Sequence, residues 1–283
     1  MAEDRQTITA AFDWRAPNYA KSEWHRAYAA QLVEAAPVRA GHRVLDAATG
    51  TGFAAIALAR RVDSSGRVIG VDLSAGMLAQ ARAAIRAAGL GHVVLVRGDA
   101  AEHPPFAAST FDAVMCSAGL LYMPFASALR EWRRLLVSGG FVGFSTMRGG
   151  FPMPGRLFRD CAAEYGLRLP DPSAPLGSEA AATAALSAAG FTDITIVPGS
   201  VTLSPSDLAM AWESNLRSAA HSPVRELSAA DQTRMRGRYL TALDAARLAD
   251  PSLVARAEVL YAFGRRGRTA APSADERDVS ADA

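Results

Sequence analysis

The chain has 283 residues, enough for one large α/β domain or for one domain with an elaborated cap. Its formal net charge is +2 and its basic residues are scattered, so the charge gives no reason to expect a nucleic-acid partner. The two cysteines, Cys116 and Cys161, are too few and too far apart for a disulfide framework or a zinc cluster. We therefore expect two core thiols and no metal site.

The N-terminus and the hydropathy pattern bear on localisation. Residues 1–6 are polar and contain no signal-peptide core, and no apolar run reaches the roughly 18 residues that a membrane span needs. We expect a cytoplasmic protein without a membrane partner. Lys21 is the single lysine, so the other 29 of the 30 basic residues are arginine, a usage typical of GC-rich bacterial genomes.

The N-terminal segment combines an irregular start with a helical pattern. We expect residues 1–10 to be irregular. From Ser22 a helix is predicted, because Trp24, Tyr28 and Leu32 recur on one face at four-residue spacing. Ser22 has a side chain suited to cap that helix.

Strands and helices then alternate. Strands are predicted at residues 44–46, 67–72, 93–97, 111–117 and 140–146, and helices at 53–62, 75–88 and 126–136. Such alternation builds a parallel sheet with right-handed crossovers, in which ligands bind beyond the carboxyl ends of the strands.

After residue 147 the pattern changes and glycine and proline become frequent. Helices are predicted at 155–165, 180–189, 205–220 and 228–248, and a strand at 191–197. Residues 253–263 are ambiguous and fit a final antiparallel strand at the sheet edge. From residue 264 onward the composition predicts a disordered tail.

A glycine-rich loop follows the first predicted strand. Asp46 ends the strand, Gly50 and Gly52 form the turn, and a helix follows, which is how backbone amides cradle a nucleotide-like cofactor. Gly50-x-Gly52-x-x-Ala55 fits a dinucleotide pattern. Asp46, expected at the mouth of the loop, instead favours the cationic, phosphate-free S-adenosylmethionine. An ordinary strand-turn-helix remains the third interpretation.

Two further strands also end in carboxylates. Asp72 offers two acceptor oxygens for ribose hydroxyls, the alternative being a helix N-cap. Met77 follows in the first helical turn, placed either against an adenine face or in the core. Asp99 ends the third strand and suits the exocyclic amine of adenine. Three acids at successive strand ends favour the methyl donor over a dinucleotide.

Candidate catalytic residues are less well defined. Small residues around Ser117 let the backbone approach a sulfonium, and Tyr122 is placed to face an acceptor. The candidate bases are His103 on a loop, His25 on the N-terminal helix, and His221, with Tyr122 as a hydrogen-bonding alternative. For each histidine, a solvated or packing role is the competing interpretation.

The ordered motifs resemble a known family. Leu45-Asp46-Ala-Ala-Thr-Gly50-Thr-Gly52, Val71-Asp72, Gly98-Asp99-Ala100, Phe111-Asp112 and Val-Ser-Gly139-Gly140 together look like class I S-adenosylmethionine-dependent methyltransferases, of the branch similar to ubiquinone and menaquinone biosynthesis enzymes. The resemblance covers about residues 40–147. Ala48 departs from the pattern, which has glycine there.

The resemblance implies roles for individual residues. Asp72 would hold the ribose, Asp99 the adenine and the Asp46–Gly52 loop the methionine part, with Tyr19 closing over the donor. The implied donor-binding residues are Tyr19, Asp46, Ala48, Gly50, Gly52, Asp72, Leu73, Met77, Asp99, Ala100 and Ser117.

The fold expected is a doubly wound, mainly parallel, seven-stranded Rossmann-like sheet with helical cap insertions. We divide the chain into an N-terminal lid (1–36), a donor-binding core (37–147), the remaining sheet with a substrate cap (148–263) and a tail (264–283). The apolar residues that could line a pocket in the cap are Phe151, Met153, Phe158, Tyr165, Met210, Trp212 and Tyr239. For each of them, an ordinary core position is the competing interpretation.

The function expected is SN2 methyl transfer from S-adenosylmethionine, with S-adenosylhomocysteine as product, to carbon, oxygen or nitrogen of a small aromatic or lipophilic molecule. Two alternatives stay open: a cyclase-like reaction on the same fold, and an NAD-dependent oxidoreductase. A homodimer is compatible with the sequence.

Overall fold

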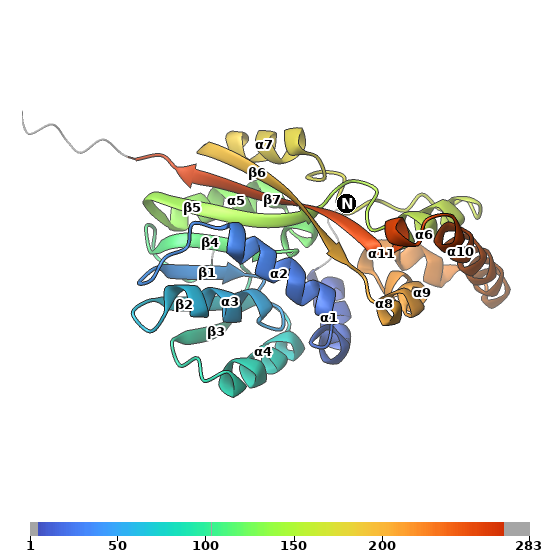
Figure 1. Cartoon of the computed structure of the whole chain (residues 1–283), viewed down its shortest axis with the longest axis horizontal. Coiled ribbons are helices and arrows are strands. Elements are labelled where there is room, and N and C mark those ends of the chain that lie inside the picture. Colours follow the sequence, from blue (N-terminus) through green and yellow to red (C-terminus); the bar gives the residue numbers. More distant parts are fainter. Residues whose placement is uncertain (1–4, 103, 269–283) are drawn as a thin grey trace, which may run out of the picture.

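A computed structural model describes residues 5–102 and 104–268. It contains one seven-stranded sheet with the strand order β3-β2-β1-β4-β5-β7-β6, flanked by helices (Figure 1). The strands are β1 (Arg43–Ala47), β2 (Arg67–Asp72), β3 (Val93–Arg97), β4 (Phe111–Ser117), β5 (Leu136–Met147), β6 (Phe191–Thr202) and β7 (Arg256–Arg266). β1 to β5 are parallel, and β7 is antiparallel to β5 and β6.

Helices precede and connect the strands, and several of them cover the two faces of the sheet (Figure 1). They are α1 (Arg5–Tyr19), α2 (Glu23–Ala35), α3 (Phe53–Val62), α4 (Ala75–Ala87), the 3-10 helix η1 (Leu120–Tyr122), α5 (Phe125–Leu135), α6 (Met153–Ala163) and α7 (Glu179–Ala188). On one face α2 and α3 bury Leu32 and Leu58 against Met115. On the other, α5 and α7 bury Trp132 and Leu186. Both core faces were predictable, because these helices carry apolar residues at helical spacing.

The last strand departs from the expected position. β7 is antiparallel, as predicted, but it lies between β5 and β6, so that β6 forms the edge of the sheet (Figure 1). β7 also continues to Arg266, so the prediction that a disordered tail begins at residue 264 is wrong for residues 264–268. Residues 269–283, the rest of that tail, lie outside the described residues.

The C-terminal helices form a cap with its own core. The cap contains α6, α8 (Pro205–Ala209), α9 (Ala211–Leu216), the 3-10 helix η2 (Ala219–Glu226), α10 (Ala229–Ala249) and α11 (Pro251–Ala255). Phe158, Trp212 and Tyr239 are packed together in its centre. The single helix predicted over 205–220 is wrong, because Met210 leaves helical geometry between α8 and α9.

The N-terminal segment is more regular than its sequence suggests. Residues 5–10, expected to be irregular, are part of α1, which packs on α4. α2 begins as predicted, but Ser22 does not cap it through its side chain. Instead, Ser22 Oγ lies 2.7 Å from Nδ1 of His25.

The strand register brings the motif residues to one edge. Asp46 pairs with Gly70, Asp72 with Arg97, and Ser117 with Ser145. These pairs lie at the carboxyl ends of parallel strands, beside α1 and on the side of the cap (Figure 1).

Among the helices of the described residues, none has the length and apolarity to cross a membrane.

Candidate donor-binding site

The loop after β1 makes the tight turn that the sequence predicts. Ala48, Gly50 and Gly52 have φ values of 55°, 55° and 86°, in the left-handed region that favours glycine. The turn is fixed to the sheet because the Thr49 amide donates to Val71 O at 2.9 Å. A Cβ at Gly50 would meet nothing within 4 Å, so this part of the loop borders open space.

Asp46 lies beneath the loop and not at its mouth. The side chain is fully buried, and Oδ2 accepts a hydrogen bond from Thr49 Oγ1 at 2.6 Å. Burial raises the pKa of Asp46 to about 7, although the Thr49 bond acts in the opposite direction. The Asp46 side chain is thus closed off from solvent, and its contact with a cofactor stays a prediction. Its carboxylate anchors the loop from below.

The second oxygen of Asp46 nevertheless remains available. Oδ1 is buried and makes no hydrogen bond of normal geometry with the described residues, although the backbone amide of Ala55 lies close enough to the carboxyl group to lower its pKa. A buried carboxylate oxygen without a partner is costly, and a cation or N–H donor beside it would offset that cost. The site therefore fits a ligand with an ammonium or sulfonium group better than one with a pyrophosphate.

Asp72 organises the loop and the next helix together. Oδ2 accepts from the Gly50 amide at 2.8 Å, and Oδ1 accepts from the Ser74 amide at 2.9 Å. Burial raises the pKa of Asp72, and these two amide bonds oppose the rise. Each carboxylate oxygen has a second lone pair, so the group retains acceptor capacity for ribose hydroxyls.

Ala48 is accommodated by a second glycine. A Cβ at Gly119, which precedes η1, would lie only 2.6 Å from Cβ of Ala48 and 3.0 Å from Sγ of Cys116. The alanine that replaces the expected loop glycine thus fits because residue 119 has no side chain. Ala48 lies in the loop as predicted, with its methyl group directed at the β4–η1 connection.

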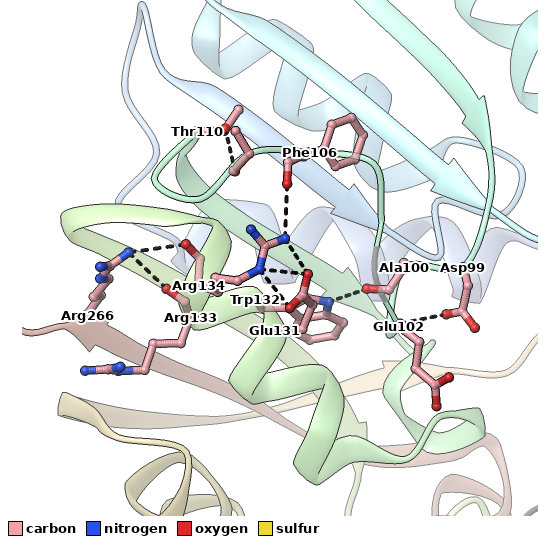
Figure 2. A network of polar contacts seen from close by, with 11 residues as sticks. Asp99, Ala100, Glu102, Phe106, Thr110, Glu131, Trp132, Arg133, Arg134 and Arg266 are labelled. Atoms are coloured by element: carbon pink, nitrogen blue, oxygen red, sulfur yellow. Dashed lines mark hydrogen bonds and ion pairs between the residues drawn. The ribbon is translucent and has the colours of Figure 1, made fainter.

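Asp99 is present at the end of β3 but already has partners. Oδ1 accepts from the amides of Ala101, at 2.7 Å, and Glu102, at 3.2 Å. Oδ2 lies 3.1 Å from Nε of Arg5 on α1. Ala100 is buried beside it, where its carbonyl accepts from the Trp132 indole at 2.7 Å (Figure 2). The indole bond fixes the backbone next to Asp99.

Helix α1 lies against this edge of the sheet. Asp13 Oδ1 accepts from Ser74 Oγ at 2.5 Å and from the Gly76 amide at 2.8 Å, at the start of α4. Phe12 meets Tyr122 edge-to-face with ring centroids 5.1 Å apart. Neither Arg5 nor Asp13 was singled out from the sequence. The only local sign of the Asp13 contact in the sequence is the glycine at position 76, since a Cβ there would lie 3.1 Å from Asp13 Oδ1.

The remaining predicted donor-binding residues are Tyr19, Met77, Leu73 and Ser117. Tyr19 stacks on Phe53 with ring centroids 6.4 Å apart, and its buried hydroxyl has a raised pKa. Met77 is buried and its amide donates to Ser74 Oγ, so packing accounts for it. Leu73 and Ser117 lie beside Asp72 and at the end of β4, respectively.

The candidate bases lie in different places. His25 is enclosed by Tyr19 and Trp24, with ring centroids 3.9 and 3.5 Å away, and burial together with the nearby Arg15 lowers its pKa. His103 lies outside the described residues.

His221 belongs to the core of the cap. It stacks on Phe158, its Nδ1 lies 2.9 Å from Asn215 O, and burial lowers its pKa to about 4. The expectation that Phe158, Trp212 and Tyr239 line an open pocket is also wrong, because all three are buried in this core. Within the described part of the chain, no group of three or more potential ligands could hold a metal ion.

Comparisons with known proteins agree with this geometry. A family model described as a methyltransferase domain matches residues 44–140. A demethylmenaquinone methyltransferase from Staphylococcus aureus (strain MRSA252) is 37% identical over 138 residues, which cover 48% of this chain and 56% of that relative. The chain thus spans about half the length of that relative.

A second relative matches over a larger share of its length. The aklanonic acid methyltransferase DauC from Streptomyces sp. (strain C5) is 33% identical over 154 residues, 52% of this chain and 70% of the relative. The chain belongs to the S-adenosylmethionine-dependent methyltransferase family. The methyltransferase fold is shared by the YcgJ protein from Bacillus subtilis, with a TM-score of 0.58 and 19% identity over 86% of this chain and 99% of that one.

Proposed function

We propose that the protein transfers a methyl group from S-adenosylmethionine to a small aromatic or lipophilic molecule. The observation that carries the proposal is the fully buried Asp46, whose Oδ1 makes no hydrogen bond of normal geometry with the described residues, beneath a glycine loop that Asp72 fastens to α4. Both relatives named above are methyltransferases, one named for demethylmenaquinone and one for aklanonic acid. Neither name supports the oxidoreductase or the cyclase.

The residues of the chain would divide the donor between them. Asp72 would accept the ribose hydroxyls, Asp99 the adenine amine, and the Ala48–Gly52 loop with Asp46 the methionine part. S-adenosylmethionine supplies a methyl group on a positively charged sulfur, which is already an electrophile. The protein then has to align the acceptor with that methyl group, at about 3–3.5 Å, and to exclude water.

The aromatic side chains near the loop suit this second task. Tyr19 on α1 and Tyr122 on η1 would cover the reacting end of the donor, and the contact of Phe12 with Tyr122 joins the two elements. His25 lies next to Tyr19, and burial keeps its imidazole neutral by lowering its pKa, which also makes it a weak base. We propose α1 and α2 as the lid, His25 or Tyr122 as the group that handles the acceptor proton, and the cap helices as the source of acceptor specificity.

The proposal is tested with labelled donor. Purified protein is incubated with methyl-labelled S-adenosylmethionine and a panel of quinols, phenols and polycyclic acids, and products are separated by chromatography. Label in an acceptor, together with formation of S-adenosylhomocysteine, is the expected result. Conversion of a substrate without label would identify a non-transfer reaction, and calorimetric binding of NADH but not of S-adenosylhomocysteine would identify an oxidoreductase.

Asp72 provides a variant with a clear direction. Asp72→Ala should weaken S-adenosylhomocysteine binding by more than a hundredfold, because it removes charged hydrogen bonds to the ribose worth about 1.5–3 kcal/mol each. Asp63→Ala serves as the control, since this carboxylate lies at the end of α3 and accepts from the amide and the hydroxyl of Ser65, away from the donor loop. Wild-type affinity in Asp72→Ala, measured by calorimetry on folded protein, would show that the donor placement is wrong.

A further inference from the structure

Arg5 on α1 forms an ion pair with Oδ2 of Asp99, the carboxylate oxygen that the proposed donor would use. Oδ1 of Asp99 is taken up by the amides of Ala101 and Glu102, whereas Oδ2 faces Nε of Arg5 at 3.1 Å. The guanidinium also pairs with Glu102 through its NH2 group. Arg5 therefore presents N–H donors to the atom that would accept the exocyclic amine of an adenine.

The other end of α1 is held independently. Asp13, two turns further along, accepts from Ser74 Oγ and from the Gly76 amide at the start of α4. The two oxygens of Asp72 accept from different groups, the Gly50 and Ser74 amides. Asp13 thus joins the centre of α1 to the start of α4. Of the contacts described above, the one that joins the first turn of α1 to the end of β3 is the ion pair of Arg5.

We propose that Arg5 is a latch that competes with the adenine amine of the donor for Oδ2 of Asp99. The oxygen keeps a second lone pair, but an oxygen whose charge is already paired with a guanidinium accepts more weakly from a further N–H group, so the two donors oppose each other. The inference rests on the proposed function and adds a residue outside the family motifs. When the amine occupies Oδ2, the Arg5 guanidinium moves away, with Glu102 as its remaining partner. Asp13 keeps the centre of α1 on α4, so only the first turn has to move.

The exposure of the pair sets the size of the effect. The side chains of Arg5 and Asp99 are 50% and 18% exposed, respectively, so the interaction is partly screened by water. Partly exposed ion pairs of this kind change an equilibrium about two- to fivefold. The latch would therefore adjust donor affinity without preventing binding, and added salt would weaken it, because the Debye length falls to about 3 Å at 1 M.

Calorimetry with S-adenosylhomocysteine separates the latch from a simple binding contact. At 50 mM NaCl we expect Arg5→Gln to bind about two- to fivefold more tightly than the wild type. The ratio should approach one at about 1 M NaCl, where the pair is screened. Arg82→Gln is the matched control, because it removes the same charge from an exposed position on α4 and should behave as the wild type.

Hydrogen exchange gives a readout that does not depend on activity. In protein without ligand, Arg5→Gln should speed amide exchange in the first turns of α1 and leave residues 14–19 unchanged. Unaltered or weaker binding by Arg5→Gln at low salt would overturn the latch while the donor assignment stands. If the wild type itself fails to bind S-adenosylhomocysteine, the proposed function is wrong, and the latch is overturned with it.

Discussion

Asp46 is the carboxyl group on which pH acts most directly. Burial raises its pKa to about 7 in the folded chain, against about 3.9 for an unperturbed aspartate. The folded state therefore binds this proton more tightly than the unfolded state. The contribution of this proton to the free energy of unfolding is fully present below about pH 4, and it is lost as the pH rises towards the folded pKa of Asp46.

The stability of an Asp46→Asn variant should expose this contribution. Asparagine is uncharged at every pH, so the free energy of unfolding of the wild type, taken relative to the variant, should fall by about 2–3 kcal/mol between pH 5 and pH 8. Urea denaturation at several pH values measures the difference. Asp63→Asn is the control, because its exposed carboxyl has a lowered pKa and should not reproduce the fall. A difference that is constant with pH would contradict the raised pKa of Asp46.

At the scale of elements, the donor loop and the β4–η1 connection depend on each other. Ala48 occupies left-handed backbone with φ of 55°, which costs an alanine about 1 kcal/mol relative to glycine. Gly119 has φ of −80°, which any residue adopts, so the 2.6 Å approach to Ala48 is the reason for a glycine there. The two positions therefore form a steric pair across two loops.

A double-mutant cycle tests this pair. Gly119→Ala should lower the free energy of unfolding by about 1–3 kcal/mol through overpacking. Ala48→Gly should stabilise slightly, by about 0.5 kcal/mol, because it relieves the backbone strain. The combination should recover much of the loss, although Cys116 still crowds the new methyl group. Additivity of the two changes within about 0.5 kcal/mol in urea denaturation would show that the loops do not interact.

The elements that sequence could predict are those with local signals. β2, β3 and β4 begin and end where their apolar runs and flanking turn residues predict, and α3 follows its alanine-rich periodicity. α1 was missed because its hydrophobic periodicity is weak and its position depends on the tertiary bonds of Asp13.

The residues of the candidate site also divide into those with a local sequence signal and those without one. Asp72 and Asp99 were found because strand ends in a parallel sheet meet at one edge. Arg5 and Asp13 were missed because long-range partners leave no spacing in the sequence. The depth of Asp46 was also misjudged, since strand position alone does not distinguish a carboxylate above a loop from one beneath it.

At the scale of the whole molecule, the sheet is completed by the last strand of the described chain. β7 pairs with β5 on one side and β6 on the other, so its insertion joins the parallel half of the sheet to its edge strand. The position between them could not be predicted from the sequence, because the apolar run of β7 suits a central and an edge strand equally. Long-range contacts at the end of β7 add to this strand pairing.

Arg266 supplies those contacts at the end of β7. Its NH1 group donates to the carbonyls of Arg133 and Arg134 at 3.3 Å each (Figure 2). It also donates to the carbonyl of Leu136 and to Ser109 Oγ, the latter at 3.2 Å. Arg266→Ala should therefore lower the free energy of unfolding by about 1.5–3 kcal/mol, the range for hydrogen bonds to a charged group. Arg265→Ala removes the same charge from an exposed side chain that donates to Gly139 O and lies 5.9 Å from the Phe141 ring, and it should cost less than about 1 kcal/mol. Equal losses in urea denaturation would mean that β7 is held by its strand pairing alone.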